Sequence, residues 1–291
     1  MVVDAEALVI RKRLEQSLKE LPPLPTAVAK VLDETNKTEP DLHRIDEIIS
    51  GDQALASKVL RIVNSAYYGL SRQVTSVGQA VMILGIQQVR TITLSVGSIA
   101  AFSSKNPVDP EGARRFWEHS FATAAACQTI GHKLGVDKKS LETLSTIGIL
   151  HDIGRMFIFC NFKSVYDKMV QKALKQGVSY EEVEAHFLGE NHAGIGAMIA
   201  EKWGLPEQIV HSIRWHEGPF EPTVDRALAT LHLADWMHKH LYYGDDKAPV
   251  GGIDPVIYEA LGLSDEVLEQ IQEQVRKKVA EASQLYGMVA A

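Results

Sequence analysis

The feature that most restricts how this chain can fold is the spacing of its apolar residues. Along almost the whole sequence, apolar side chains recur every three or four residues, and they rarely alternate with polar ones. The first spacing places apolar side chains on one face of an α-helix, whereas a half-buried strand requires alternation. We therefore predict an all-α protein.

Turn-forming residues divide the predicted helices into groups. The clearest break lies at 103–112, where Ser-Ser-Lys-Asn-Pro and Asp-Pro-Glu-Gly interrupt the helical periodicity. We predict two helical lobes, an N-terminal bundle of five or six helices over 1–105 and a second lobe over 113–243. A C-terminal helical tail over 254–291 follows.

The tail carries an apolar stripe opposite many charged residues, with Ser264 as the expected N-cap. The stripe consists of Leu268, Ile271, Val275, Val279 and Ala282. The stripe could pack on a lobe of the same chain or on a second copy, and we favour the same chain.

Several local features predict how single helices begin and end. Asp41 and Asp52 stand where an N-cap carboxylate would accept hydrogen bonds from the free amides of a first turn. The apolar spacing continues without a break through 140–159, which we predict to be helical throughout. Asn64 and Ser65 could bind a partner or nucleotide, but we favour a structural role in which they bond the last carbonyls of a helix.

Charge and hydropathy exclude some classes of function. The formal net charge is −7, and neither part of the chain has the excess of bases that nucleic-acid binding requires. Segments 41–49 and 52–63 resemble a helix-turn-helix in order, yet both carry apolar stripes and balanced charge, so we expect no DNA binding. The sequence shows no long uncharged apolar run, and its N-terminus lacks the basic-then-apolar order of a secretory signal peptide. We therefore expect a cytoplasmic protein without a membrane span. Cys127 and Cys160 lie in apolar stretches typical of buried, reduced thiols.

The residues with metal-binding chemistry lie mainly in the second predicted lobe. His151 and Asp152 follow the apolar run 147–150, and imidazole with carboxylate suits iron, manganese or zinc. Adjacent residues on a helix diverge by about 100°, so both reach one ion only beside an internal cavity. Further candidates recur on predicted helices, namely His119, His192, His211, His216 and Asp235.

Each candidate also has a purely structural interpretation. His151 and Asp152 could form a buried hydrogen-bonded pair, although we favour metal ligation. Asp235 could equally well bond between two helices, and His192 could instead cap a helix that begins near residue 193. We favour His216 as a ligand.

His211 lies five residues before His216 and would point elsewhere on a shared helix. We therefore expect His211 to be a core or supporting residue.

The order of these residues resembles the HD superfamily of metal-dependent phosphohydrolases. In that superfamily a metal ion is held by four residues matching His119, His151, Asp152 and Asp235. His192 and His216 lie where the related HD-GYP branch, the cyclic-di-GMP phosphodiesterases, supplies ligands for a second ion. The resemblance implies that these six residues hold one or two divalent ions.

Motifs in the N-terminal part narrow the resemblance to the HDOD domain, the HD-related output domain. These motifs are Leu21-Pro22-Pro23-Leu24-Pro25, Asp52-Gln53-Ala54-Leu55, Lys58-Val59-Leu60, Val63-Asn64-Ser65-Ala66-Tyr67-Tyr68-Gly69, Val74-Thr75-Ser76-Val77 and Leu84-Gly85. The resemblance runs from near residue 20 to about residue 240. It implies a bacterial regulatory or signal-output role, with no enzymatic reaction generally established for the family.

Three departures argue against HD-GYP activity. Trp215 occupies the first place of the paired histidines that precede Glu217, and Gly218-Pro219-Phe220 replaces the Gly-Tyr-Pro element. Arg155 stands where active enzymes have lysine after His-Asp-Ile-Gly. Arginine binds phosphate, but its planar guanidinium does not simply replace a compact ammonium.

We therefore expect a signal-transduction output protein whose HD pocket binds a metal ion, a phosphate or a nucleotide. A ligand would shift the arrangement of the lobes through its differential affinity for two states. The alternative is a metal-dependent phosphohydrolase acting on a nucleotide or cyclic dinucleotide. In that case Asp152 and Arg155 would be catalytic, Asp152 by holding the ion and Arg155 by steadying the developing charge. We favour the regulator over the enzyme and expect signalling protein partners, whose identity the sequence does not reveal.

Overall fold

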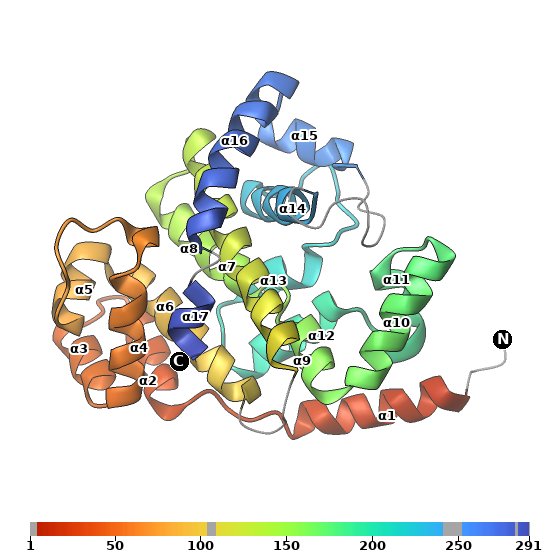
Figure 1. Cartoon of the computed structure of the whole chain (residues 1–291), viewed down its shortest axis with the longest axis horizontal. Helices are drawn as coiled ribbons and strands as arrows, with labels where there is room; N and C mark the ends of the chain where they lie inside the picture. The colour runs from red at the N-terminus through yellow and green to blue at the C-terminus, as the bar shows by residue number, and fades with distance from the viewer. Residues whose placement is uncertain (1–4, 104–108, 241–251, 283–284, 291) are drawn as a thin grey trace. The chain divides into compact units, whose positions relative to one another are not determined.

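The computed structural model describes residues 5–103, 109–240, 252–282 and 285–290, and these residues form helices and no strand (Figure 1). The all-α prediction is confirmed. The chain divides into two compact units. The first contains Met1–Pro22 and Leu150–Ser264, and the second contains Pro23–Ile149 and Asp265–Ala291.

The first unit is built around α12, which packs against α9 and α13. Its helices are α1 (Ala5–Lys19), α9 (Ile153–Asn161), α10 (Lys163–Gln176), α11 (Tyr180–Leu188), α12 (His192–Lys202), α13 (Glu207–Trp215), α14 (Arg226–His238) and α15 (Pro255–Leu261). Helix α1 lies against α11, and the indole N–H of Trp203 donates to the carbonyl of Pro22 over 3.2 Å. These contacts attach the N-terminal helix to a unit whose other helices come more than a hundred residues later.

The second unit pairs the long helix α7 with the C-terminal helix α16. Its helices are α2 (Thr26–Thr35), α3 (Leu42–Ser50), α4 (Gln53–Val63), the 3₁₀ helix η1 (Ala66–Tyr68), α5 (Val77–Leu84), α6 (Ile86–Ser103), α7 (Pro110–Lys133), α8 (Lys138–Leu150, ending at the unit boundary), α16 (Asp265–Ala282) and α17 (Leu285–Ala290). Ile271, Val275 and Val279 of the predicted stripe are fully buried. The tail therefore packs within its own chain, as expected.

The division into units does not follow the predicted boundary at 103–112. Helix α7 begins inside the predicted break, at Pro110, and continues into the predicted second lobe, but it belongs to the same unit as α2–α6. The predicted tail is also divided, because α15 belongs to the first unit and α16 to the second. The physical reason is that α7 is apolar on several faces and buried along most of its length, so neighbouring helices must cover it. Turn residues mark where helices end, but they do not determine which helices share a core.

The predictions about helix ends are confirmed for Asp41, Asp52 and Asn64, whereas that for Ser65 is wrong, because its buried hydroxyl makes no hydrogen bond within the described part of the chain. Asp41 accepts hydrogen bonds from two backbone amides at the start of α3, and Asp52 accepts one at the start of α4. The Asn64 side-chain amide donates to the carbonyls of Leu60 and Val74 over 2.9 and 2.8 Å, and its oxygen accepts from the Val74 amide over 2.8 Å. Asn64 therefore ends α4 and anchors the following loop, which is the structural role we favoured.

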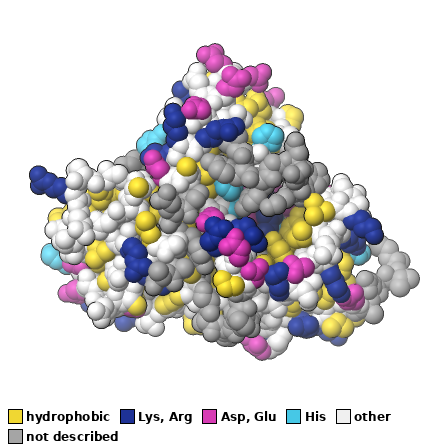
Figure 2. Space-filling view, in the orientation of Figure 1, with side chains coloured by type: hydrophobic (Ala, Val, Ile, Leu, Met, Phe, Trp, Pro, Cys, Tyr) yellow, Lys and Arg dark blue, Asp and Glu magenta, His cyan; other side chains and the backbone are white. Residues whose placement is uncertain are grey.

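Both cysteines are thiols outside any disulfide, as predicted, with Cys127 buried and Cys160 partly buried. No helix in the described ranges combines the length and apolarity needed to cross a bilayer. On the face shown in Figure 2, acidic and basic side chains are interspersed among apolar ones.

Candidate metal centre

His151 and Asp152 lie in the short turn between α8 and α9. The prediction of one uninterrupted helix over 140–159 is therefore wrong. Asp152 occupies the N-cap position of α9, yet its side chain makes no capping hydrogen bond. Because the turn departs from helical geometry, the two neighbouring side chains are not held about 100° apart and both enter one cluster.

Two glycines bring α9 and α12 into close contact at this cluster. A Cβ atom on Gly154 would lie 2.0 Å from the carbonyl oxygen of His192 and 2.5 Å from the amide nitrogen of Gly196. Such distances are far below van der Waals contact, so only glycine fits at position 154. The close approach places the start of α12, and with it His192, beside Asp152.

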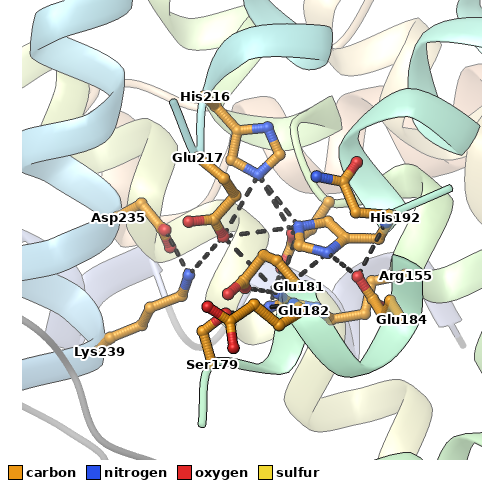
Figure 3. A network of polar contacts seen from close by, with 12 residues as sticks. Arg155, Ser179, Glu181, Glu182, Glu184, His192, His216, Glu217, Asp235 and Lys239 are labelled. Atoms are coloured by element: carbon orange, nitrogen blue, oxygen red, sulfur yellow. Dashed lines mark hydrogen bonds and ion pairs between the residues drawn. The ribbon is translucent and has the colours of Figure 1, made fainter. Parts of the chain in front are cut away.

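His192 is fully buried and is oriented by Glu184 of α11. One carboxylate oxygen of Glu184 accepts hydrogen bonds from the backbone amide of His192 over 2.8 Å and from its Nδ1 over 2.6 Å (Figure 3). Since a carboxylate only accepts, Nδ1 carries a proton, so Nε2 is the nitrogen that the neutral ring would offer to a metal ion. The interpretation of His192 as a helix cap is wrong, because the Asn191 side chain caps α12.

His216 follows α13 and is also fully buried. Its Nδ1 donates to the carbonyl of Ile213 over 2.7 Å, so Nε2 is again the nitrogen that the neutral ring would offer to a metal ion. The Nε2 atoms of His192 and His216 face each other at 3.3 Å, and the Arg155 guanidinium lies 3.2 Å from that of His192. Two lone pairs directed at one point are favourable only when a positive charge lies between or beside them, and a metal ion would add to the charge of Arg155.

Four donor atoms converge on that point. The Nε2 of His192 lies 3.1 Å from Asp152 Oδ1 and 3.5 Å from Glu217 Oε1. The Nε2 of His216 lies 3.6 and 3.7 Å from the same two oxygens, and all four donors fall within 4.8 Å of one another. Ligands bonded tetrahedrally at about 2.0–2.1 Å are roughly 3.3–3.4 Å apart. The four residues therefore fit a divalent ion with little rearrangement.

A second group of charges adjoins this donor set on α14. Asp235 Oδ1 lies 3.5 Å from His151 Nε2, and His151 Nε2 lies 3.8 Å from Asp152 Oδ2. The ammonium of Lys239 lies 2.6 Å from Asp235 Oδ2 and 3.0 Å from Glu217 Oε1 (Figure 3). Asp235 thus takes part in an extended charge cluster, in which its ion pair with Lys239 is shorter than its contact with His151.

Arg155 is held by several acids of the same pocket. Its guanidinium lies 2.9 Å from Asp152, 3.4 Å from Glu181 and 3.7 Å from Glu217. The guanidinium carbon also lies 5.2 Å from the ring centre of Tyr180, in a cation–π arrangement. Arg155 therefore serves first as an internal counter-ion.

The pKa values of the pocket residues reflect this balance of burial and charge. Burial opposes ionisation of Asp152, but Arg155 and His151 outweigh it and hold the pKa of Asp152 well below its ordinary value. Burial and Arg155 oppose protonation of His192, yet Glu184 and Asp152 hold its pKa well above the ordinary value. Burial lowers the pKa of His216. The point between the imidazoles therefore attracts positive charge, which a proton or a metal ion can supply.

The formal charges in the pocket favour cations. Five carboxylates, those of Asp152, Glu181, Glu184, Glu217 and Asp235, surround two cationic side chains, those of Arg155 and Lys239. With neutral histidines this group carries three uncompensated negative charges. A phosphate would be repelled unless an added cation bridged it to the pocket.

The structure brings together most of the predicted ligands. Of the six, the cluster in the first unit contains His151, Asp152, His192, His216 and Asp235. His119 is buried on α7 in the second unit, and its ligation stays a prediction. The prediction of His211 as a core residue is wrong, because its side chain is exposed on α13.

Sequence reasoning missed Glu184, Glu217 and Lys239 as members of the site. Glu217 had a usable signal, since it directly follows His216, whereas an acid on α11 and a lysine after α14 look like ordinary surface charges. Their role depends on which helices pack together.

An all-helical unit with clustered histidine and aspartate is what a resemblance to the HD superfamily implies. The sequence matches the HDOD domain family over residues 21–219, and the chain belongs to that family.

Solved structures share the fold of this chain, and a curated protein is similar to it in sequence. A crystal structure of a candidate phosphohydrolase from Shewanella amazonensis is 26% identical, with a TM-score of 0.75, over 95% of this chain and 97% of that one. An HDOD domain protein of unknown function from Geobacter sulfurreducens shares the fold, with 23% identity and a TM-score of 0.74, over 97% of this chain and 99% of that one. An uncharacterized Treponema pallidum protein is 21% identical over 242 residues, 80% of this chain and 46% of that protein. The chain spans less than half the length of the curated relatives it matches.

Proposed function

We propose that this protein is a regulatory signal-output protein whose HD-type pocket binds a divalent ion. Asp152, His192, His216 and Glu217 would hold the ion. The observation that carries the proposal is the pair of imidazole Nε2 atoms, 3.3 Å apart, whose other nitrogens donate to a carboxylate and a carbonyl. Iron, manganese and zinc suit this mixture of imidazole and carboxylate.

The bound ion would connect three parts of the first unit. Asp152 precedes α9, His192 begins α12 and His216 follows α13, so the ligands come from segments far apart in the sequence. Binding that requires the folded arrangement stabilises it by about 2.7 kcal/mol when the ion is present at a hundred times its Kd. Ion occupancy would thereby regulate the population of the ordered unit, and a signalling partner would recognise that arrangement.

Two observations favour regulation over catalysis. Arg155, the residue available to steady a transferring phosphoryl group, is already bound to Asp152 and lies near two further acids. Lys239 is likewise bound to two carboxylates. A phosphate or nucleotide would therefore reach the pocket chiefly through the ion, as a bridging ligand.

A metal-dependent phosphohydrolase is the second candidate. The similarity to a candidate phosphohydrolase of Shewanella amazonensis, 26% identical over nearly the whole chain, favours it. The ion would supply electrophilic activation of a phosphate, while Asp152 would hold it and Arg155 would orient the phosphoryl oxygens.

The test combines metal analysis with an activity panel. Protein stripped with a chelator is reloaded with Mn²⁺, Fe²⁺ or Zn²⁺, and bound metal and melting temperature are measured. We expect metal in the wild type, and its loss in Asp152→Asn but not in the exposed control Asp33→Asn. Absence of both bound metal and thermal stabilisation in the wild type would overturn the ion site.

The same preparations decide between regulator and enzyme. They are incubated with nucleotides, cyclic dinucleotides and a generic phosphodiester. A regulator binds without turnover, whereas turnover that disappears in Asp152→Asn establishes the phosphohydrolase instead.

A further inference from the structure

Lys239 occupies an unusual position for a lysine on a helix end. Its ammonium lies 2.6 Å from Asp235 Oδ2, four residues earlier, and 3.0 Å from Glu217 Oε1, which comes from the segment after α13. The Asp235 side chain is only 3% exposed and that of Glu217 only 15%. This is therefore an ammonium shared by two largely buried carboxylates, unlike the solvent-exposed pairs at the same spacing that are common on helices.

The two carboxylates that bind the ammonium are also in contact with candidate metal-ligand atoms. Asp235 Oδ1 lies 3.5 Å from His151 Nε2, and Glu217 Oε1 already belongs to the first donor set. A divalent ion held by His151 Nε2 and Asp235 Oδ1 at about 2.0–2.2 Å would share the Asp235 carboxylate with the ammonium. Two cations so close together would repel strongly, so the ammonium and such an ion would exclude each other.

We propose that Lys239 is a built-in counter-ion that excludes a second divalent ion and limits the pocket to one. The inference rests on the proposed ion site of Asp152, His192, His216 and Glu217. It adds that the ion content of this pocket is set by a side chain of the chain itself. The pocket would thus hold one ion, with the His151–Asp235 pair kept from a second.

The experiment counts ions in the full chain. Wild type, Lys239→Met and Lys239→Arg are stripped of metal, reloaded with excess Mn²⁺ and separated from free metal by gel filtration. The bound manganese per chain is then measured by elemental mass spectrometry. We expect the bound Mn²⁺ of Lys239→Met to be twice that of the wild type, while Lys239→Arg, which keeps the positive charge, stays at the wild-type level.

A matched control uses another lysine of the first unit. Lys163 also pairs with an aspartate four residues away, over 2.6 Å, but both side chains are more than 40% exposed. Lys163→Met should leave the ion content unchanged.

Thermal unfolding supplies a second readout. Removal of Lys239 leaves two buried carboxylates without their shared cation, so Lys239→Met should melt below the wild type after stripping. Mn²⁺ should raise its melting temperature by more than it raises that of the wild type. If stripping unfolds Lys239→Met, Lys239→Gln serves as a second variant. Both Lys239→Met and Lys239→Gln are then purified in Mn²⁺ to provide folded protein.

The outcomes separate this inference from the proposed function. Equal Mn²⁺ in wild type and Lys239→Met, with about one ion in each, overturns the role of Lys239 and leaves the ion site intact. Two ions in the wild type also overturn it. No ion in the wild type and one in Lys239→Met overturns the ion site but supports exclusion of a cation by Lys239.

Discussion

Replacement of Gly154 by alanine tests the link between helix packing and the metal centre. The added Cβ would lie 2.0 Å from the carbonyl oxygen of His192, which is 1.4 Å short of the 3.4 Å at which ordinary contact begins. Both partners are backbone atoms of packed helices, so no flexible side chain can move aside. Helices α9 and α12 would have to separate by roughly that distance, and overpacking of this kind costs about 1–3 kcal/mol or more.

Alanine is also a better helix former than glycine by about 1 kcal/mol, which partly offsets the clash. We therefore expect a net loss of about 2 kcal/mol in the free energy of unfolding, or roughly 4–8 °C in melting temperature for a unit of this size. Because His192 would move away from Asp152, from which it is now 3.1 Å distant, the affinity for Mn²⁺ should fall as well.

The assay is urea unfolding followed by circular dichroism, with Mn²⁺ titration by calorimetry on the same protein. Gly287→Ala is the control, since a Cβ there meets no atom within 4 Å and the residue lies in α17. It should be neutral or slightly stabilising. Wild-type stability and wild-type Mn²⁺ affinity in Gly154→Ala would refute the argument that this contact positions the site.

Three further predictions concern single residues. Glu184→Gln should weaken Mn²⁺ binding by about 10–100-fold, because supporting carboxylates orient metal-binding imidazoles. Calorimetry should show no such change for Glu182→Gln, a variant of an exposed neighbour, and an equal change in both variants would contradict the role of Glu184. Asn64→Ala should lower the free energy of unfolding in urea by about 1–3 kcal/mol through loss of its bonds to the α4 carbonyl and the following loop, whereas the exposed Asn36→Ala should have little effect. Burial raises the pKa of Cys160 from 9.0 to about 12. A thiol reagent at pH 8 should therefore modify Cys160 far more slowly in folded than in urea-unfolded protein, and equal rates would show that the thiol is not protected.

The amino-acid sequence by itself determined the helices, many of their ends and the chemical character of the pocket. The three- and four-residue spacing of apolar side chains predicted an all-α protein, and Asp41, Asp52 and Asn64 act at helix ends as their side-chain chemistry requires. These properties are local, since a helix period and a capping bond involve residues only a few positions apart. The histidines and aspartates at positions 151, 152, 192, 216 and 235 could be predicted as metal ligands, because imidazole nitrogens and carboxylate oxygens together suit divalent ions.

Only the tertiary structure decided which of these pieces meet. Contacts between distant segments join α1 to the helices after residue 150, pair α7 with α16, and bring α9 against α12 at Gly154. The same packing turns Glu184, Glu217 and Lys239 from apparently ordinary charges into parts of the metal centre. The physical reason is that periodicity records which face of a helix is buried but not which partner covers it. A carboxylate or an ammonium acquires its function from neighbours that lie far away along the chain.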